Sequence, residues 1–371
     1  MDKKVRIGIL GGGGILGAHA PGFRKMVDRC TVAAVAEPVA AKGERIRTLL
    51  GDEVDIYDSY EELLDRADVD AVDILLPHDL HLPATEAAAR AGKHVLTEKV
   101  MARNIWECDR MIEACERAGV TLTVCHDRRY HGQWQALKKV VDSGLLGEIS
   151  YWKLDHNQDV DPTAAGIDWI ADRDALGGGA IMSCLTHQID ALRWYGGEAT
   201  SVTCMTKDLP DRMQGETIGV VIAQMESGAL AQLSINWTTR SGKDSLFSPG
   251  ANADSNGLWY EMVQVCGSKG EAYYMAGKGT FAMTYEDVDI STLIPCEKPA
   301  SQGSFARVKT EDWTGHERCV CEWIKSLCSE PAEIVTSGSA VRGTVELAEA
   351  AYRAAETGRA VQLPIEPKPW V

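Results

Sequence analysis

Four consecutive glycines, Gly11 to Gly14, directly follow a short apolar run, VRIGIL, that begins at Val5. The run is typical of a buried parallel strand, and a helix-like pattern resumes behind the glycines. Glycines at such a turn let the backbone approach a pyrophosphate at the positive N-terminus of the helix. The stretch therefore predicts a dinucleotide site. Two registers of the G-x-G-x-x-G pattern fit and stay open: Gly12, Gly14 and Gly17 in full, or Gly11 and Gly13 with Leu16 in the third position.

A carboxylate stands where a dinucleotide site requires one. The second apolar run, Thr31 to Ala36, ends in Glu37, which lies 20 residues after Gly17. At this separation a carboxylate can accept the adenosine ribose hydroxyls. Pro38 and Val39 follow, so no Arg or Lys directly beside Glu37 neutralises a 2'-phosphate. The sequence predicts NAD rather than NADP.

Strand and helix patterns alternate up to about residue 125, which predicts a parallel, doubly wound sheet. The expected strands are 5–10, 31–36, 54–57, 69–76, 94–97 and 120–125, with helices at 40–50, from 59, at 83–91 and at 104–117. Ligands of such sheets bind at the carboxyl ends of the strands. The residues expected to converge there are Gly11 to Gly14, Glu37, Pro77 to His81, Glu98, Lys99 and His126 to Arg128.

The pattern changes after an expected helix at 133–143. Strand-like segments follow at 149–156, 201–206, 217–226, 230–237, 259–266 and 271–275, with helices near 181–195, 315–328 and 339–357. Tight turns join some of these strands, which predicts an antiparallel sheet. The polar stretch 240–257 predicts a functional loop or an oligomer contact. The fold class is therefore α/β with two domains, a Rossmann domain at 1–126 and an α+β domain with an open antiparallel sheet at 127–371.

Composition narrows the class of partner. The 371 residues carry a formal net charge of -16, which argues against a nucleic-acid groove or an anionic membrane surface and favours a small-molecule substrate. No apolar run reaches the length of a membrane span, and Met1 to Lys4 leads straight into the first strand without a secretory leader. We therefore expect a cytoplasmic protein whose eleven cysteines are reduced thiols.

The chain resembles the glucose-fructose oxidoreductase, inositol dehydrogenase and rhizopine catabolism (Gfo/Idh/MocA) family of NAD(P)-dependent oxidoreductases over nearly its whole length. The segments that carry the resemblance are GILGGGGILGAHAPGF, LLPHDLHLPATEAAARAGKHVLTEK, LGEI, GGGAIMSCLTHQIDALRWYGG, GSKGEAYY and VELAEAAYRAAETGRAVQLP. The resemblance implies a Rossmann domain followed by an open-faced sheet domain, a bound sugar or polyol, and a homo-oligomer.

Two residues acquire a catalytic role through this resemblance. Lys99 stands where the family has the lysine of its Glu-Lys-Pro motif, and His187 where it has the histidine of an Asp-x-x-x-His pair. Val100 replaces the motif's proline, so the direction of the Lys99 side chain is less certain. Ser183 replaces the aspartate that usually contacts substrate hydroxyls or the lysine. A serine has no charge, so that contact must be weaker, absent or supplied elsewhere.

The expected ligand contacts follow from the strand ends and the resemblance together. We expect the cofactor to contact Gly11, Gly13, Gly14, Ile15, Leu16, Glu37, Pro77, His78, His81, Glu98, Lys99 and Arg128. We expect the substrate to contact Lys99, Asp127, His156, Trp169, Ser183, His187 and Asp190.

The chemistry these residues suit is oxidation of a secondary alcohol. Lys99 can stabilise the developing alkoxide, and a histidine such as His187 can take the hydroxyl proton at neutral pH, with their roles exchangeable. Each residue also has a purely structural interpretation. Lys99 could be a solvated loop lysine beside Glu98, and His187 could be a hydrogen-bonded core histidine on an apolar helix. Asp190, three residues after His187, could orient its ring or reach the substrate.

Two groups of residues are of the types that bind metal ions, but we expect neither group to bind a metal ion. His78 and His81 lie near Asp79 in a loop that the resemblance assigns to the cofactor. On a helix, Cys319 and Cys321 point in different directions and cannot converge on one ion with His316. We therefore expect no metal.

The sequence predicts NAD-dependent oxidation of a ring hydroxyl of a sugar, glycoside or cyclic polyol. An NAD-retaining glycosidase that works through a transient oxo-sugar is one alternative. A non-catalytic sugar- or NAD-binding regulator is the other, because Ser183 replaces the usual aspartate.

Overall fold

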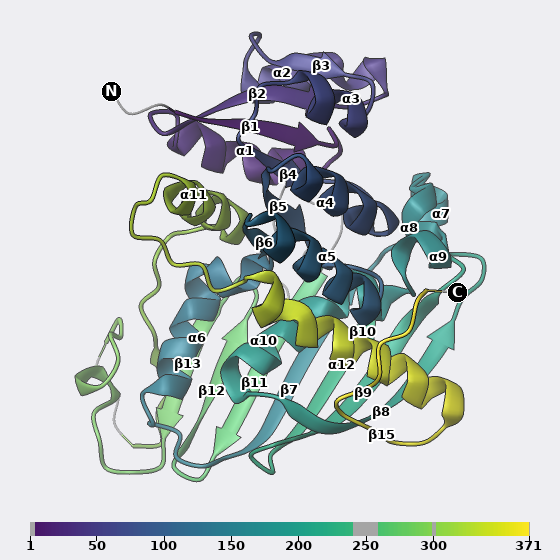
Figure 1. Cartoon of the computed structure of the whole chain (residues 1–371). Coiled ribbons are helices and arrows are strands. Elements are labelled where there is room, and N and C mark those ends of the chain that lie inside the picture. Colours follow the sequence, from purple (N-terminus) through teal and green to yellow (C-terminus); the bar gives the residue numbers. More distant parts are fainter. Residues whose placement is uncertain (1–3, 240–258, 299–301, 371) are drawn as a thin grey trace. The chain divides into compact units, whose positions relative to one another are not determined.

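The computed structural model describes residues 4–239, 259–298 and 302–370 (Figure 1). The chain divides into two compact units. The first comprises Met1–His131, Trp313–Val345 and Pro367–Val371, and the second Gly132–Asp312 and Glu346–Glu366. The polar stretch 240–257, expected to be a functional loop or an oligomer contact, lies outside the described residues.

The first unit has a six-stranded parallel sheet in the order β3-β2-β1-β4-β5-β6, which confirms the doubly wound prediction. Its strands are β1 Val5–Leu10, β2 Cys30–Ala36, β3 Asp55–Tyr57, β4 Ala71–Ile74, β5 His94–Glu98 and β6 Leu122–Cys125. Its helices include α1 Leu16–Lys25, α2 Gly43–Leu50, α3 Tyr60–Arg66, α4 His81–Arg90 and α5 Ile105–Ala118. The order reverses between β1 and β4, and the residues after these strands lie at the edge where such folds bind ligands.

The ends of α5 show how local sequence sets these elements. The Asn104 side chain accepts a hydrogen bond from the Glu107 N–H, at 2.9 Å, and so caps the first turn. Gly119 ends the helix with φ of 67°, a conformation that glycine adopts without strain. The apolar face between them packs Ile105, Cys108 and Met111 into the core.

Helix α11, Gly315–Leu327, belongs to the first unit although it comes late in the chain. It packs on α1 so closely that a Cβ at Gly22 would lie 2.6 Å from the Val320 Cβ. Lys25 of α1 also pairs with Glu317 of α11, at 2.5 Å. The unit boundaries therefore differ from a single division after residue 126, because the chain returns to the Rossmann unit.

The second unit is built on a nine-stranded sheet in the order β14-β13-β12-β11-β7-β10-β9-β8-β15. The strands are β7 Ile149–Gln158, β8 Ala199–Asp208, β9 Glu216–Met225, β10 Leu230–Asn236, β11 Trp259–Gly267, β12 Gly270–Met275, β13 Gly279–Thr284, β14 Ala306–Arg307 and β15 Val361–Gln362. Strands β7 and β10 pair in parallel, and the other pairs are antiparallel. The expected open sheet is present, but it is mixed rather than purely antiparallel.

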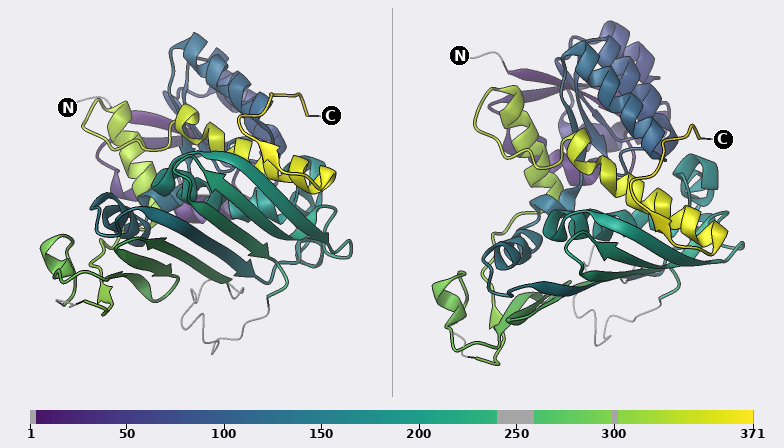
Figure 2. Two further views of the ribbon diagram at one scale, coloured as in Figure 1. Left: turned by 90° about the horizontal axis from the view of Figure 1, so that it is seen from below. Right: turned by 60° about the horizontal axis from the view of Figure 1, so that its bottom comes forward.

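Helices cover one face of this sheet (Figure 2). The helices of the unit are α6 Gly132–Asp142, α7 Pro162–Ala165, α8 Asp168–Ala171, α9 Arg173–Leu176, α10 Thr186–Gly196 and the later part of α12 Gly338–Thr357. Side chains alternate along β9, with Val221 and Ala223 buried and Val220 and Ile222 exposed. None of the described helices is long and apolar enough to cross a membrane.

A buried carboxyl group joins three segments of the second unit. Glu216 Oε1 accepts hydrogen bonds from the Ile181 N–H, at 2.7 Å, and from the Tyr352 hydroxyl, at 2.9 Å. That hydroxyl also accepts the Gly179 N–H, at 2.9 Å. A Cβ at Gly179 would lie 2.4 Å from Glu216 Oε2, so only glycine fits there. Burial raises the pKa of Glu216 from its usual 4.5 to about 7.

This raised pKa predicts a pH-dependent stability. The folded protein holds the Glu216 proton more tightly than the unfolded chain, so the stabilisation is complete below pH 4.5 and is lost as pH rises to about 7. Glu216→Gln mimics the protonated acid and should remove this loss. Relative to the parent, we expect the variant to gain on the order of 3 kcal/mol between pH 4.5 and 7.5.

Urea unfolding followed by tryptophan fluorescence at both pH values measures this difference. Glu226→Gln, which changes an exposed glutamate, is the matched control and should follow the parent. An identical pH dependence in the parent and Glu216→Gln would contradict the prediction.

Candidate functional site

The glycine turn leaves the backbone open where a dinucleotide phosphate would lie. Gly11 has φ of +105°, and a Cβ there would lie 2.5 Å from the Leu75 carbonyl oxygen, so this tight turn requires glycine. A Cβ at Gly13 or Gly14 would meet nothing within 4 Å. A Cβ at Gly12 would also be crowded, 2.7 Å from Ile46 Cδ1, but Gly12 lacks the positive φ of Gly11, so the backbone conformation favours the register that begins at Gly11. Helix α1 then begins at Leu16, and the turn fits a pyrophosphate at its N-terminus.

Glu37 is held against this turn. Its Oε2 accepts the Gly12 N–H and its Oε1 the Val39 N–H, both at 3.0 Å. The side chain is buried at the end of β2. A carboxylate fixed here fits the predicted contact with the adenosine ribose.

Cations lie closer to Glu37 than the sequence predicted. Lys42 Nζ lies 2.9 Å from Glu37 Oε2, and Arg45 Nη1 donates to the Gly13 carbonyl at 3.0 Å. No Arg or Lys is adjacent to Glu37 in the sequence, as expected. In the folded structure, however, a cation does lie beside Glu37, so the expectation is wrong there. The 3₁₀ turn Ala40–Lys42 and the start of α2 bring both cations back to the strand end. A preference for NAD thus depends on the Glu37 carboxylate itself.

We expect the parent protein to bind NAD more tightly than NADP, because Glu37 accepts ribose hydroxyls and repels a 2'-phosphate. Glu37→Ala should weaken NAD binding about tenfold or more, since a charged acceptor is lost. Glu37→Ala should also reduce the preference for NAD over NADP, because the cations Lys42 and Arg45 remain when the carboxylate is lost. Calorimetric titration with both cofactors measures the two affinities. Lys42→Ala is the matched control and should keep the preference. Tighter NADP binding by the parent would contradict the prediction.

The loop after β4 is tied to the loop after β5 through His81. The ring's Nε2 lies 2.9 Å from the Leu76 carbonyl, and its Nδ1 lies 2.9 Å from the Val100 carbonyl. Burial lowers the pKa of His81. Both ring nitrogens face the backbone, so His81 is placed to hold the predicted cofactor loop Pro77 to His81 rather than to reach a ligand itself.

Lys99 directly follows β5, and its backbone is anchored by the residue before it. Glu98 Oε2 accepts the Lys99 N–H at 3.1 Å, and Glu98 Oε1 lies 2.9 Å from His19 Nε2. The other ring nitrogen of His19 lies 2.8 Å from Asp73 Oδ2. Asp73, His19 and Glu98 are all buried. The peptide bond between Lys99 and Val100 is cis.

The pKa values in this cluster follow from burial and pairing. Burial would raise the pKa of Glu98, but the hydrogen bond from His19 and the charges of His316 and Lys99 hold it at about 2. Burial would lower the pKa of His19, yet Asp73 and Glu98 together raise it well above 6.5. The arrangement favours an imidazolium clamped between two carboxylates.

The residues after β6 extend this cluster. Asp127 Oδ2 lies 2.5 Å from Arg128 Nη1 and 3.7 Å from His316 Nδ1. Burial lowers the pKa of His316. The predicted ligand contacts Asp127 and Arg128 therefore pair with each other, and α11 supplies a histidine beside them.

His187 lies in the second unit, within a group of buried polar side chains. Its ring stacks on the ring of His156, with centroids 6.4 Å apart and an interplanar angle of 13°. His156 Nδ1 lies 3.0 Å from Glu261 Oε1, and Gln188 Nε2 donates to that same oxygen at 3.2 Å. The helix α10, β7 and β11 bring these four residues together.

The other predicted substrate residues lie in different structural environments. Ser183 lies in a π-helical turn, Ile181–Leu185, that precedes α10, and its Oγ lies 3.7 Å from the Cys184 sulfur. Asp190 is fully buried, which favours an orienting role over direct substrate contact. Trp169 is partly buried on the short helix α8. Trp152, by contrast, is a core residue stacked on Tyr195 with centroids 6.1 Å apart.

The first unit thus holds the predicted cofactor residues together with Lys99, Asp127 and Arg128. The second unit holds the remaining predicted substrate residues. Sequence reasoning missed the residues that position them: His19, Lys42, Arg45, Asp73 and Glu261. For Asp73, the local signal is a charged residue inside the otherwise apolar strand β4.

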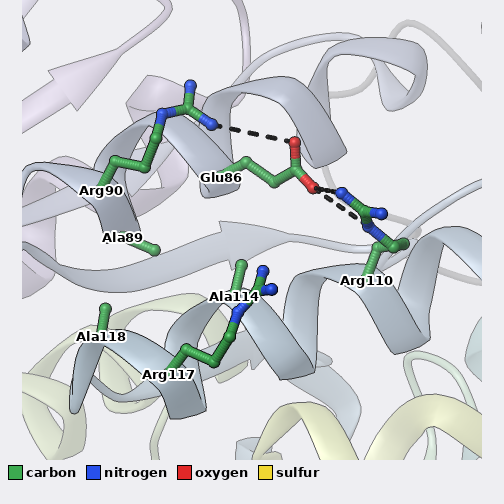
Figure 3. A pocket seen from close by; sticks show the side chains of 7 residues that line it. All are labelled: Glu86, Ala89, Arg90, Arg110, Ala114, Arg117 and Ala118. Atoms are coloured by element: carbon green, nitrogen blue, oxygen red, sulfur yellow. Dashed lines mark hydrogen bonds and ion pairs between the residues drawn. The ribbon is translucent and has the colours of Figure 1, made fainter.

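A shallow groove of about 400 Å³ lies between α4 and α5, and none of the residues that line it is among the predicted site residues (Figure 3). It is lined by Glu86, three arginines and three alanines. Glu86 carboxylate oxygens lie 2.7 Å from Arg110 and 4.0 Å from Arg90. Alternating charges on exposed helices are typical of a solvated surface, and we assign the groove no chemistry.

Two family descriptions match most of the chain. Residues 5–126 match the oxidoreductase family with an NAD-binding Rossmann fold, and residues 134–273 match the GFO/IDH/MocA C-terminal domain. The chain belongs to the GFO/IDH/MocA family. Its first unit is accordingly an NAD-binding Rossmann domain, and the protein is an NAD-dependent oxidoreductase.

Relatives in this family act on sugars and polyols. The chain is 27% identical over 360 residues to the inositol 2-dehydrogenase of Rhizobium meliloti, covering 97% of this chain and 99% of that one. It is 30% identical over 235 residues to a D-xylose 1-dehydrogenase (NADP(+)) of Haloferax volcanii, covering 61% and 69%. The WlbA dehydrogenase of Bordetella pertussis, solved with NADH and UDP-GlcNAcA, shares the fold with a TM-score of 0.78 at 22% identity, over 98% and 100% of the two chains.

Proposed function

We propose that the protein oxidises a secondary ring hydroxyl of a sugar, glycoside or cyclic polyol to the oxo form. Bound NAD would supply the hydride acceptor, held by the glycine turn from Gly11 to Gly14 and by Glu37. The single observation that carries the proposal is the placement of Lys99 at the carboxyl end of β5, in an NAD-binding Rossmann domain. The sugar and polyol dehydrogenases among its relatives support the substrate class.

Lys99 suits the developing charge. Its ammonium can donate hydrogen bonds to an oxygen that becomes an alkoxide as the hydroxyl loses its proton. Glu98 holds the Lys99 backbone at 3.1 Å, so the side chain starts from a fixed point. Preorganised donors stabilise such charge most effectively, because they need not reorient during the reaction.

His187 suits the accompanying proton transfer. Its imidazole can accept the substrate hydroxyl proton and later release it to solvent. The stacked His156 ring, with Glu261 at its Nδ1, limits how the His187 ring can turn. These contacts support His187 as the base and give Glu261 a positioning role.

The purified protein should be incubated with NAD and a panel of sugars, polyols and glycosides, while NADH absorbance and product mass are followed. NADH formation with a product two hydrogens lighter supports the proposal. Released sugar without net NADH would instead indicate the NAD-retaining glycosidase. Binding without any product would indicate the regulator, which the uncharged Ser183 permits.

On the substrate found in this way, Lys99→Ala and His187→Ala should each lower the rate on the order of a hundredfold or more, because each removes a group that acts in the transition state. Both variants should still bind NAD. In His187→Ala the residual rate should rise with pH, since hydroxide in the solvent can replace the missing base. Stopped-flow absorbance and calorimetry measure the rate and the cofactor affinity.

His94→Ala is the matched control, because His94 lies at the opposite end of the strand that Lys99 follows. It should keep the parent rate. Near-parental turnover by both site variants would overturn the assignment of the site. Loss of NAD binding in His187→Ala would instead favour a core histidine.

The sheet face of the second unit that no described helix covers supports the expected homo-oligomer. Met205 is 81% exposed on β8, and Val220, its cross-strand partner on β9, is 41% exposed. Ile222 and Leu230 are also exposed on neighbouring strands. An apolar sheet face of this kind is typical of a protein interface.

We therefore expect light scattering at micromolar protein to give a mass that is a multiple of 40.3 kDa. Ile222→Glu should dissociate the oligomer, because it places a charge in an apolar contact. Thr203→Glu would sit opposite Ile222 on β8 and should act in the same direction. Glu226→Gln, in the exposed turn after β9, is the control. A clean 40.3 kDa species from the parent would contradict the expectation.

A further inference from the structure

Four side chains of metal-binding type converge inside the first unit. His19, Glu98, Cys125 and His316 each place one donor atom within 4.8 Å of all the others. They come from α1, the end of β5, the end of β6 and α11. The first three are buried, whereas the His316 side chain is 21% exposed. The cluster is thus enclosed but accessible from one side.

Both imidazoles have their Nε2 atoms near the same carboxylate oxygen. His19 Nε2 lies 2.9 Å and His316 Nε2 lies 3.6 Å from the same oxygen, Glu98 Oε1. Their other nitrogens face carboxylates, with His19 Nδ1 2.8 Å from Asp73 Oδ2 and His316 Nδ1 3.7 Å from Asp127 Oδ2. Histidines that bind metals usually hydrogen-bond such a second partner, which fixes the ring and raises its basicity. His19 has this bond, whereas the 3.7 Å distance at His316 is longer than a hydrogen bond.

The remaining two donors are also held in place. Glu98 Oε2 accepts a hydrogen bond from the Lys99 N–H, at 3.1 Å. The other oxygen, Oε1, is directed at the cluster. Cys125 is a free thiol at the end of β6, with Cys319 packed against it. One oxygen, one sulfur and two nitrogens therefore lie within 4.8 Å of one another.

We propose that His19, Glu98, Cys125 and His316 form a structural zinc site. Imidazole, thiolate and carboxylate are the ligands Zn²⁺ takes, and four protein ligands are typical of a structural rather than a catalytic site. Zinc bond lengths place the donors of a tetrahedral site about 3.3–3.6 Å apart. Binding displaces to solvent the Cys125 thiol proton and the proton between His19 Nε2 and Glu98 Oε1.

The ion would tie α11 to the Rossmann sheet. Cys125 and His316 are far apart in sequence, and the sheet, α1 and α11 meet at the cluster. The inference does not depend on the proposed sugar oxidation. It also differs from the metal group that the sequence suggested, because Cys321 lies elsewhere, with its sulfur 3.8 Å from the Gly22 carbonyl oxygen.

The full-length protein, stripped of metal with a chelator, should be titrated with Co²⁺ and then with Zn²⁺. We expect one Co²⁺ per chain to give the intense visible absorption of a tetrahedral ion and a thiolate-to-cobalt charge-transfer band. Zn²⁺ should displace it and remove both signals. Asp73→Asn, which alters the partner of His19, should weaken binding about 10- to 100-fold.

Variants separate this site from adventitious binding. Cys125→Ser should lose the charge-transfer band, and His316→Ala, at the accessible side, should weaken binding. Cys321→Ser, a buried thiol on the same helix as His316, should keep both signals. If Cys125→Ser does not fold, His316→Ala decides the question. The proposal is overturned if the parent binds no stoichiometric Co²⁺ or Zn²⁺, or if His316→Ala binds as tightly as the parent.

Discussion

The buried carboxylate of Glu98 is the interaction on which the chemistry of the first unit depends. A carboxylate at the end of a buried strand is costly unless partners replace its water. The His19 ring faces one of its oxygens and the Lys99 backbone N–H occupies the other. The same group therefore anchors α1, ends β5 and sets the starting point of the lysine side chain. Removing any partner would leave a buried charge uncompensated.

The second unit contains two further buried carboxyl groups, and each is stabilised by a different kind of partner. Glu261 lies against the His156 ring, and Glu216 accepts a backbone N–H and the Tyr352 hydroxyl. A hydroxyl and an amide stabilise a carboxyl without a full positive charge, and the pKa of Glu216 rises to about 7. The hydrogen bond from His19 and the charges of His316 and Lys99 instead lower the pKa of Glu98 to about 2. Burial alone therefore does not set the charge of these acids, because the partner decides it.

The cofactor-binding turn shows how closely opposing charges are placed. Glu37 Oε2 accepts hydrogen bonds from both the Gly12 N–H and the Lys42 ammonium. A ribose hydroxyl and a 2'-phosphate would meet the same few side chains, and the balance between carboxylate and cation selects one of them. This closeness gives a physical reason why NAD- and NADP-using enzymes can occur among similar sequences.

The sequence by itself determined the elements and much of the chemistry. Glycines behind an apolar run, Glu37 at the correct separation and the alternation of strands and helices predicted the Rossmann unit, because local periodicity and turn chemistry act over a few residues. The family motifs marked Lys99 and His187. Tertiary structure alone decided what surrounds them. Sheet pairing made β7 and β10 parallel, α11 returned to α1, and His19, Asp73 and His316 met Glu98 from distant parts of the chain. Such contacts depend on packing between elements, and no local pattern encodes which polar side chains will share one buried space.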